Sequence, residues 1–443
     1  RRQRQMCIRD RVYLHPSFWY PNDKDIFKGN KNMTDIRQEF IQQAIQLTRN
    51  AEVLPGGVNG GVTELAAKLQ HAADTNTPLR VKLGMDPTRP DLHLGHTVVM
   101  RKLREFQKLG HKIVLIVGGA TAMIGDPSGK SETRPALTKE QVEENAKTYF
   151  EQMSKVLDVS EAEVVNNADW LHKLNFTELL QLAGKVTVAQ MMTRDDFAKR
   201  YSEGKPIAIH EFFYPLMQAY DSVAIDSDIE LGGTDQRFNT LLGRDIQSAY
   251  GKKYPQLVMM LPLLEGTDGV VKMSKTYPEH CISLTDSAKD MFGKLMSIPD
   301  TLITRYYSLL TDVEQAELVK MDKEIESGSI NPRDIKMKLA HMITEEYHGK
   351  DGADKAQEDF INVVSNKGIP DDIESVKIDA EGINILDLLV KLSFVQSKGE
   401  AKRLIQGGGV KLDGEKLSDM AYTVKPAMDV VLQAGKRKFA KLI

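Results

Sequence analysis

The sequence predicts an α/β fold, with a parallel-sheet domain followed by a helical domain and a small α+β domain. Three observations support this prediction. Apolar runs typical of buried parallel strands alternate with helical patterns from residue 79 to residue 261. Strand signals end at about Ser287, and helical patterns follow as far as Val364. A compact segment with an Asp-Gly hairpin turn at Asp413 and Gly414 comes last.

Length, charge and cysteine content narrow the class of protein. At about 150 residues per domain, the 443 residues suggest two to four domains. The formal net charge of −3 gives no overall signal for nucleic acid, so contact with RNA requires local basic patches. Cys7 and Cys281 lack metal-ligand spacing and offer no disulfide framework, which favours a reducing, cytoplasmic location. The apolar stretch at residues 113–125 contains glycines and is too short for a membrane span.

The N-terminal segment begins with a basic run at residues 1–11 and shows no apolar core of a signal peptide. We expect residues 1–32 to be a non-native or disordered extension and the native protein to start at Met33. An RNA-binding arm is the alternative. The apolar spacing at residues 36–47 then predicts an amphipathic helix. A glycine-rich hinge at 55–61 and a short helix at 62–73 lead into the first strand.

The first strand leads into a motif of the kind that binds phosphate. Residues 79–83 read as an extended apolar run and 84–87 as a turn. His93-Leu94-Gly95-His96, here called the histidine motif, then opens a helix that extends to Leu109. Free N–H groups and the helix dipole favour anions at such a helix start, and Gly95 lets the backbone approach closely. Histidines at a helix start are more often caps or surface residues, but the preceding strand and the glycine favour a functional role.

A second candidate phosphate site follows a later strand. Residues 257–261 form an apolar run suited to a buried strand. The next loop holds Lys272-Met273-Ser274-Lys275, here called the lysine motif, near Gly266 and Gly269, which permit movement. Its two ammonium groups can close over a leaving pyrophosphate, and a clamp that tightens in the transition state raises the rate. An ordinary solvated lysine loop is the alternative.

The C-terminal part is predicted to be helical first and mixed afterwards. Helical patterns occur at residues 291–296, 302–310, 335–347 and 353–364. Residues 366–382 are polar and turn-rich, as expected for a linker. A basic helix at 397–406 then precedes a short hairpin at 410–416, and from Glu381 onward eleven Lys or Arg oppose seven Asp or Glu. This positive excess suits a phosphate backbone, and a solvated basic face is the alternative.

Taken together, the two motifs resemble the HIGH-type and KMSKS-type motifs of the class I aminoacyl-tRNA synthetases, which carry them on a Rossmann-type fold. The resemblance runs from about Thr34 to the end of the sequence. It is closest to the tyrosyl-tRNA synthetases, because three further motifs occur in that family's order: Gly-Asp-Pro-Ser-Gly-Lys at 125–130, Tyr-Pro-Leu-Met-Gln-Ala-Tyr-Asp at 214–221 and Gly-Gly-Thr-Asp-Gln at 232–236. It implies a tyrosine–tRNA ligase. Such an enzyme activates L-tyrosine with ATP to tyrosyl-adenylate and pyrophosphate, and then transfers tyrosyl to the end of tRNA(Tyr).

The resemblance also implies a domain plan and partners. It predicts a Rossmann-type catalytic domain with N-terminal helices at 33–286, a helical anticodon-binding domain at 287–365, a linker at 366–382 and a small RNA-binding domain at 383–443. The last resembles a module of a ribosomal small-subunit protein. A symmetric homodimer is implied, without membrane or DNA among its partners. Mg2+ is expected with the nucleotide because a triphosphate needs neutralising, and no dedicated metal site is expected.

Activation is the attack of a substrate carboxylate on the α-phosphorus of ATP, so the enzyme has to position reactants and neutralise charge. The resemblance implies catalytic roles for His93, His96, Lys272 and Lys275, with Lys130 and Arg134 as further pyrophosphate contacts. ATP contacts are implied for the two motifs, including Gly95, Met273 and Ser274, and for Gly84, Asp86, Thr88, Gly233 and Asp235. Tyrosine contacts are implied for Asp221 at the phenol, for Tyr214, Gln218 and Asp126 at the ammonium group, and for Gln236 at the carboxylate.

Part of the tyrosine site can be read from the residues themselves. Tyr214, Gln218 and Asp221 lie at positions i, i+4 and i+7, so a helix presents them on one face, although an ordinary half-buried helix shows the same spacing. Burying a carboxylate such as Asp221 is costly, and a phenol donor would satisfy it. One position departs from the family. Many bacterial members have a tyrosine two residues before Gly84 as a second phenol partner, whereas this chain has Lys82, which could pair with Asp221 or point elsewhere.

Two other functions fit parts of the pattern. Tryptophanyl-tRNA synthetases share the fold and both phosphate motifs, but Asp221 in its Gln-Ala-Tyr-Asp context and the C-terminal segment favour tyrosine. An RNA-binding relative without catalysis is the second alternative. The intact histidine and lysine motifs disfavour it.

Overall fold

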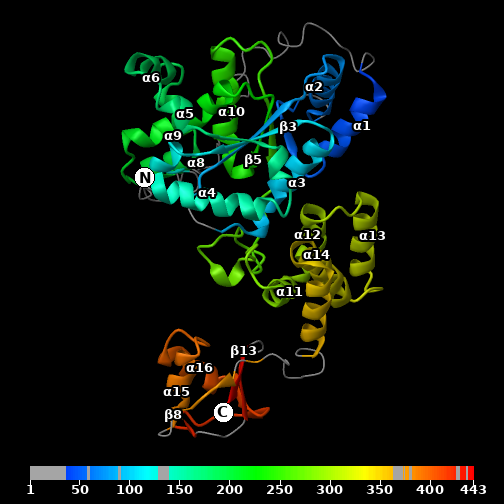
Figure 1. Ribbon diagram of the computed structural model, residues 1–443, viewed down its shortest axis with the longest axis vertical. Helices are drawn as coiled ribbons and strands as arrows, with labels where there is room; N and C mark the ends of the chain where they lie inside the picture. Colours follow the sequence, from blue (N-terminus) through cyan, green and yellow to red (C-terminus); the bar gives the residue numbers. More distant parts are fainter. Residues whose placement is uncertain are drawn as a thin grey trace, which may run out of the picture. The chain divides into compact units, whose positions relative to one another are not determined.

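The computed structural model describes residues 36–56, 60–87, 91–127, 139–362, 373, 375–378, 382–425, 430–435 and 438–443. The expectations for residues 1–32 and for a start at Met33 concern residues outside this description. Most of the predicted linker at 366–382 also lies outside it, but Ser375–Val376 form a strand that pairs with Lys438–Leu442 of the C-terminal sheet, so the linker prediction is wrong there. The chain divides into two compact units (Figure 1). One comprises the residues up to Thr285 together with Ser308–Asp312, and the other comprises Asp286–Tyr307 and Val313–Ile443.

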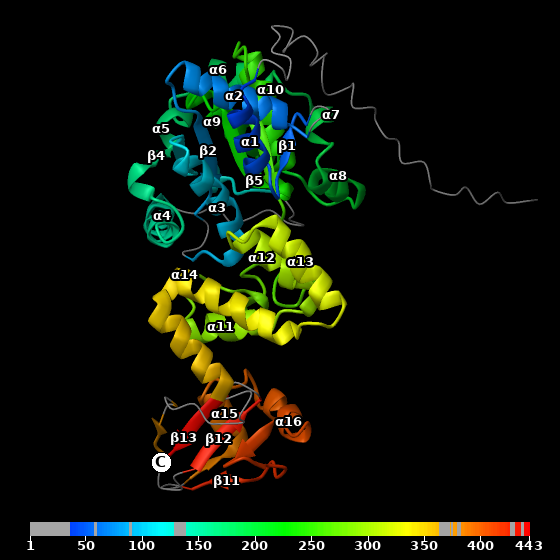
Figure 2. The same ribbon diagram turned by 90° about the vertical axis from the view of Figure 1, so that its right-hand side faces the viewer.

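The first unit is built on a six-stranded sheet with the strand order β1-β6-β5-β2-β3-β4. Its strands are β1 (Glu52–Leu54), β2 (Arg80–Met85), β3 (Lys112–Val117), β4 (Glu163–Asn166), β5 (Ile229–Gly233) and β6 (Leu257–Leu261). Figure 2 labels β1, β5, β2 and β4 of this sheet. The strands from β6 to β4 are parallel, and β1 is added antiparallel beside β6. Every residue of β6 is buried, as expected for a parallel strand covered on both faces. The predicted parallel-sheet fold is confirmed.

Helices cover both faces of this sheet. The α-helices of the first unit are α1 (Gln38–Leu47), α2 (Val62–Asp74), α3 (Leu94–Lys108), α4 (Lys139–Met153), α5 (Ala168–Leu171), α6 (Phe176–Ala183), α7 (Val188–Met191), α8 (Asp195–Ser202), α9 (Phe213–Ala224) and α10 (Arg237–Ala249), with short 3-10 turns that include η4 (Thr121–Met123), η6 (Ile209–Phe212) and η7 (Thr234–Gln236). In the strand order, β3 lies on one side of β2, whereas β6 lies on the other side of β5. The connection from β2 to β3 and the connection from β5 to β6 therefore run in opposite directions across the sheet. Right-handed crossovers therefore place α3 and α10 on opposite faces.

The turn after β2 differs from the prediction. Gly84 and Met85, expected in a turn at 84–87, instead pair with Ile116 and Val117 of β3 and extend the strand. The strand ends at Met85, and Asp86 and Pro87 have no regular secondary structure. This extension carries the strand to the edge of the sheet where the histidine motif begins.

The chain from residue 286 to residue 362 is helical, as its apolar spacing predicts. Its α-helices are α11 (Ala288–Met296), α12 (Ile303–Leu310), α13 (Gln315–Glu326) and α14 (Pro332–Phe360). The two helices predicted at 335–347 and 353–364 form one kinked element, because Gly349 adopts φ 74° inside α14. α14 packs on α11, where the rings of Phe292 and Phe360 have centroids 5.6 Å apart. None of the helices in the described part of the chain has both the length and the apolar character of a membrane span.

The C-terminal segment has a small core of its own. Its elements are β7 (Ser375–Val376), β8 (Ile383–Asn384), α15 (Ile385–Lys391), α16 (Lys398–Gln406), β9 (Val410–Leu412), β10 (Glu415–Lys416), β11 (Thr423–Val424), β12 (Val430–Ala434) and β13 (Lys438–Leu442). The sheet order is β10-β9-β12-β13-β7, and β11 pairs with β8. Asp413 (φ 45°) and Gly414 (φ 84°) form the predicted hairpin turn. Leu388 and Leu432, both 0% exposed, lie in the core of this segment.

Candidate active site

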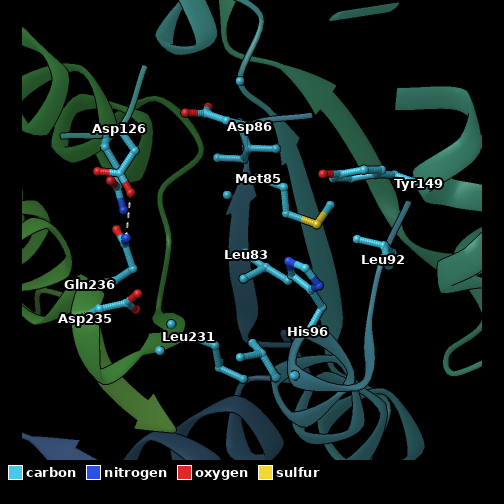
Figure 3. Close-up of a pocket in the computed structure, with 18 of the residues that line it drawn as sticks. Leu83, Met85, Asp86, Leu92, His96, Asp126, Tyr149, Leu231, Asp235 and Gln236 are labelled. Carbon is cyan, nitrogen blue, oxygen red and sulfur yellow. Dashed lines mark hydrogen bonds between the residues drawn. The ribbon is translucent and has the colours of Figure 1, made fainter. Parts of the chain in front are cut away.

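A cleft opens at the carboxyl ends of β2 and β5, where the order of the parallel strands reverses. Its volume of about 710 Å³ lies within the roughly 300–1,000 Å³ of typical ligand sites. All of its lining residues belong to the first unit. Figure 3 shows Asp126 and Gln236 on one side of the cleft and His96 and Tyr149 on the other.

The histidine motif forms the start of α3 at this cleft. His93 caps the helix, because its Nδ1 accepts the N–H of Gly95 at 3.2 Å. The Nδ1 of His96 accepts the N–H of His93, also at 3.2 Å, and the two ring centroids are 3.9 Å apart. Since both Nδ1 atoms are acceptors, each neutral ring carries its proton on Nε2 and has one donor for a ligand.

Burial keeps both imidazoles neutral. Together with His96 and the lysines of the lysine motif, it lowers the pKa of His93 to about 2. Burial and the charge of Lys275 lower the pKa of His96 to about 4. At pH 7 both rings are therefore hydrogen-bond donors without charge. The positive charge at this end of the cleft comes from the lysines.

The lysine motif meets the histidine motif inside the cleft. Met273 is only 4% exposed, and a Cβ on Gly95 would lie 3.7 Å from the Cβ of Met273. The same Cβ would lie 3.0 Å from the ring of His93, which is tighter than an ordinary contact. The glycine therefore lets the imidazole stand directly over the helix start.

Both lysines of the motif face carboxylates in the cleft. The Nζ of Lys272 lies 2.8 Å from Asp235 Oδ2, and the side chain of Lys272 is 48% exposed. The Nζ of Lys275 lies 3.9 Å from Asp91 Oδ2. An exposed ion pair of this kind contributes little to stability, so Lys272 can exchange its carboxylate for a phosphate at low cost.

The ammonium side of the expected tyrosine site is a set of linked polar groups. The hydroxyl of Tyr214 donates to Asp86 Oδ2 at 2.8 Å, and the Nε2 of Gln236 donates to Asp126 Oδ2 at 2.8 Å. The Oε1 of Gln218 is buried and has no hydrogen-bond partner in the described part of the chain. An unsatisfied buried acceptor is costly, so a cationic ligand would stabilise it.

Asp221 lines the cleft and is 3% exposed. It accepts Trp170 Nε1 at 2.8 Å and Asn167 Nδ2 at 3.2 Å. Burial raises the pKa of Asp221 to about 7, although the charge of Lys82 opposes the rise. Both donors were beyond sequence reasoning because they follow β4, whose residues alternate too weakly to predict a strand. Recognition of β4 would have placed them at the carboxyl edge of the sheet.

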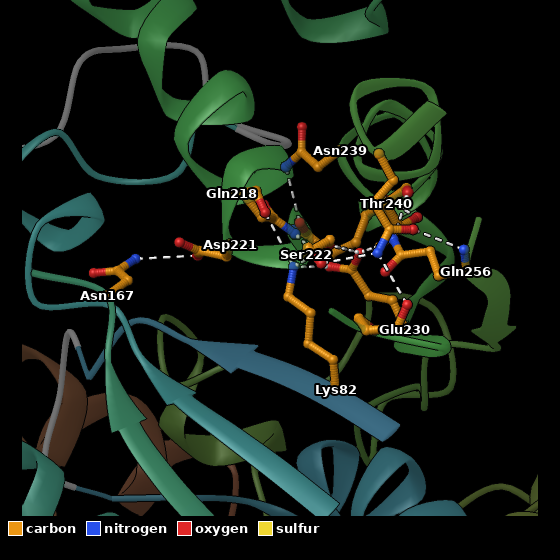
Figure 4. A network of polar contacts seen from close by, with 12 residues as sticks. Lys82, Asn167, Gln218, Asp221, Ser222, Glu230, Asn239, Thr240 and Gln256 are labelled. Atoms are coloured by element: carbon orange, nitrogen blue, oxygen red, sulfur yellow. Dashed lines mark hydrogen bonds and ion pairs between the residues drawn. The ribbon is translucent and has the colours of Figure 1, made fainter. Parts of the chain in front are cut away.

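Lys82 pairs with a residue that the sequence did not point to. Its Nζ lies 2.9 Å from Glu230 Oε1 of β5, and both residues are buried (Figure 4). Of the two alternatives left open for Lys82, the direct pairing with Asp221 is therefore wrong. A lysine in β2 and a glutamate in β5, which are partners in the register of these adjacent strands, were the signal available.

The structure brings the expected site residues together. The following all line the one cleft: His93, Gly95, His96, Lys272, Met273, Ser274, Lys275, Gly84, Asp86, Gly233, Asp235, Asp126, Tyr214, Gln218, Asp221 and Gln236. Thr88, Lys130 and Arg134 lie outside the described residues. The cleft is also lined by residues that the sequence did not single out, among them Tyr149, Glu230 and Thr240.

Comparison with known proteins identifies the family. Residues 74–365 match the family described as tRNA synthetases class I (W and Y). The chain belongs to this class I synthetase family. Residues 366–442 of the synthetase match the description Tyrosine--tRNA ligase SYY-like C-terminal domain. The membership predicted from the sequence motifs is thereby confirmed.

Relatives of this synthetase include proteins named Tyrosine--tRNA ligase. The one from Thermotoga maritima is 57% identical over 364 residues, which cover 82% of this chain and 90% of the relative. The one from Carboxydothermus hydrogenoformans is 50% identical over 406 residues, which cover 90% of this chain and 98% of the relative.

Solved structures of low sequence identity share the fold. A C-terminally truncated mitochondrial tyrosyl-tRNA synthetase from Aspergillus nidulans has a TM-score of 0.57 at 22% identity, covering 73% of this chain and 93% of that chain. A tyrosyl-tRNA synthetase complexed with L-tyrosine from Archaeoglobus fulgidus has a TM-score of 0.55 at 24% identity, covering 72% of this chain and 99% of that chain.

Proposed function

We propose that this class I synthetase is a tyrosine–tRNA ligase, which activates L-tyrosine with ATP and transfers the tyrosyl group to tRNA(Tyr). The convergence of the histidine and lysine motifs on one cleft that Asp221 also lines carries this proposal. The relatives that are 57% and 50% identical to this chain are named Tyrosine--tRNA ligase, which agrees with the proposal.

The histidine end of the cleft is suited to the nucleotide. Neutral His93 and His96 offer Nε2–H donors, and Lys272 and Lys275 offer positive charge to phosphate oxygens. Gly84 has open space where a Cβ would be, so a nucleotide can approach the β2 backbone closely. Lys130 and Arg134 are proposed as further pyrophosphate contacts from the family motif. Mg2+ would enter with the triphosphate as part of the substrate.

The chemical step needs no nucleophile from the protein. A carboxylate oxygen of tyrosine forms a bond to the α-phosphorus of ATP, and the bond to pyrophosphate breaks. Negative charge grows on the leaving group, where the lysine motif can neutralise it. Lys272 must first leave Asp235, so its strongest phosphate contacts arise as the reaction proceeds.

The opposite end of the cleft is suited to tyrosine. Gln218 Oε1 and the carboxylates of Asp86 and Asp126 provide acceptors near the expected ammonium group. Asp221 has its two oxygens held by Asn167 and Trp170, which leaves lone pairs for a phenol O–H. Gln236, fixed by its bond to Asp126, is proposed to face the substrate carboxylate.

Binding of tRNA is proposed for the second unit. The helices from α11 to α14 would contact the anticodon arm, and the C-terminal segment with its excess of Lys and Arg would contact the phosphate backbone. These roles rest on the family resemblance and on the charge of the segment. The cytoplasm is the proposed location, because ATP, tyrosine and tRNA meet there.

A homodimer is the proposed assembly. Large apolar side chains in the segment from α6 to η6 are exposed: Phe176 73%, Val188 68%, Tyr201 74% and Ile209 77%. Such exposure is typical of interaction sites, and a second copy of the chain would cover it. Sedimentation equilibrium should give twice the chain mass of 49.7 kDa. A mass of one chain at micromolar concentration would contradict the dimer.

Charging of tRNA tests the proposed function. The full chain, given ATP, Mg2+ and bulk bacterial tRNA, should attach labelled tyrosine and leave tryptophan and phenylalanine unattached. Attachment of tryptophan would identify a tryptophanyl enzyme. Binding of tRNA without attachment of any amino acid would favour a non-catalytic RNA-binding protein.

A further inference from the structure

Beneath the tyrosine side of the cleft lies a buried ion pair for which the proposed reaction has no direct use. Lys82 of β2 is 0% exposed and Glu230 of β5 is 1% exposed, and they are 2.9 Å apart (Figure 4). Removing two charges from water is unfavourable unless both are fully hydrogen-bonded, and an apolar pair of similar volume often serves as well. The pair therefore calls for a function beyond packing.

The ammonium group of Lys82 uses all of its donors within this network. Besides Glu230, it donates to the backbone carbonyl of Gln218 at 3.0 Å and to the hydroxyl of Ser222 at 2.8 Å. Gln218 and Ser222 are one turn apart on α9, so the two bonds tie that turn to β2. With three partners taken, Lys82 has no donor left for the substrate phenol.

Glu230 orients the side chains above it. Its Oε2 accepts the hydroxyl of Ser222 at 3.1 Å and the Nε2 of Gln256. Its Oε1 lies 3.5 Å from the Nε2 of Gln218. This directs the amide nitrogen of Gln218 towards the pair and leaves its Oε1 for the cleft, where that atom is buried without a partner among the described residues.

We propose that the Lys82–Glu230 pair is a positioning device for tyrosine recognition, an inference that rests on the proposed function. The pair fixes the turn of α9 that carries Gln218, presents the Gln218 Oε1 to the ammonium group of tyrosine, and supplies positive charge near the Asp221 carboxylate that accepts the phenol. Lys82 thus positions the groups that recognise tyrosine and does not itself bond to the phenol.

The charges around Asp221 agree with this role. Lys82 is the strongest of the groups that hold the pKa of Asp221 down against burial. The other groups that face the carboxylate are Trp170 and Asn167, which donate to it, Glu230, whose charge opposes ionisation, and Tyr214 on the same helix. Loss of the Lys82 charge would therefore raise the pKa of Asp221 and reduce the ionised acceptor near neutral pH.

The first test removes the hydrogen bond from the Lys82 ammonium group to the Ser222 hydroxyl and keeps the charges of both Lys82 and Glu230. Ser222→Ala should raise the KM for tyrosine about tenfold in ATP–pyrophosphate exchange, with the KM for ATP within about twofold. Ser227→Ala is the matched control, because Ser227 is equally 0% exposed, bonds the carbonyl of Ile229 and does not line the cleft. Both KM values should be unchanged in the control.

The second test removes both charges together, which avoids a lone buried charge. Lys82→Met/Glu230→Gln should lower the preference for tyrosine over phenylalanine about 100-fold. The acid limb of kcat/KM for tyrosine should also move to higher pH. Lys102→Met/Glu105→Gln is the control, since this pair on α3 is 2.7 Å apart, includes a lysine 4% exposed and lies outside the cleft lining. Lys82→Arg should retain most of the preference.

The outcomes separate this inference from the function on which it rests. Unchanged KM and selectivity in folded Ser222→Ala and Lys82→Met/Glu230→Gln would overturn the positioning role, as would equal increases of both KM values. Thermal unfolding checks the fold, and the serine variants decide alone if the double variant is unfolded. Absence of tyrosine-dependent exchange in the unaltered chain would overturn the proposed function instead.

Discussion

At the residue scale, burial acts in opposite directions on the two ends of the cleft. It lowers the pKa of His93 to about 2 and raises the pKa of Asp221 to about 7, because in each case it disfavours the charged form. The two imidazoles are thus neutral throughout the physiological range, while Asp221 titrates within it. Catalysis and recognition should therefore depend on pH in different ways.

The pH dependence of kcat/KM for tyrosine tests this difference. Because kcat/KM reports the free enzyme, it should fall as the pH drops through about 7 and Asp221 becomes protonated. The preference for tyrosine over phenylalanine should fall with it. His93 and His96 should contribute no acid limb near their ordinary pKa. A profile that is flat from pH 8 to about 6 would contradict the assignment of Asp221.

Asp221→Ala should remove most of the discrimination against phenylalanine. A site built to bond a hydroxyl rejects the analogue without it by roughly 10⁴–10⁵, a range for which a tyrosyl-tRNA synthetase is itself the known example. The ratio of kcat/KM for the two amino acids measures the effect. Selectivity that survives the substitution would show that another residue reads the phenol.

The sequence predicted the individual site residues better than the contacts among them. His96, Asp221 and Lys272 were placed by motifs, and the structure puts all three in one cleft. The partners of Lys82 and Asp221 come from strands and loops far apart in the sequence, so no local pattern could predict them. Such pairings depend on strand order, which only the fold supplies.

At the element scale, the loop that carries the lysine motif is proposed to stabilise the transition state of adenylate formation. Lys272→Ala should slow adenylate formation about 10²- to 10³-fold, because it removes charge that neutralises the leaving pyrophosphate. Tyrosine binding should change little. Rapid quench and equilibrium dialysis measure the two effects. Equal losses in both would contradict a role confined to the transition state.

A substitution in α10 tests the polar network of Glu230, Ser222 and Gln256 beneath the cleft. A Cβ on Gly243 would lie 2.8 Å from Gln256 Nε2 and 3.0 Å from Glu230 Oε2 and Ser222 Oγ. Gly243→Ala should therefore raise the KM for tyrosine several-fold while sparing the KM for ATP. Gly293→Ala in α11 is the control, because no atom lies within 4 Å of the added Cβ. Unchanged tyrosine kinetics in Gly243→Ala would argue against the network.

The elements with strong periodicity were predicted, and the short strands β1 and β4 were not. α2, α3 and β6 agree with their expected positions to within a residue or two. β1 and β4 have three and four residues with mixed burial, which leaves no periodic signal. β4 matters most for the site, because Asn167 and Trp170 directly follow it. Their bonds to Asp221 were missed for that reason.

At the scale of the whole molecule, the two reaction steps are proposed to depend on different parts of the chain. Deletion of residues 383–443 should spare adenylate synthesis, because every lining residue of the cleft lies in the first unit. Charging of tRNA should be strongly impaired. Pyrophosphate exchange and tRNA charging measure the two steps separately. Loss of both would show that the boundary before β8 is misplaced.

The histidine and lysine motifs are proposed to serve one triphosphate beside a slot for tyrosine. ATP–pyrophosphate exchange, measured with each standard amino acid in the unaltered chain, His96→Ala and Lys275→Ala, tests it most directly. Exchange should respond to tyrosine alone and fall about 10²- to 10³-fold in both variants, with tyrosine binding retained. Stimulation by tryptophan in place of tyrosine, or an unaltered rate in either variant, would contradict the claim.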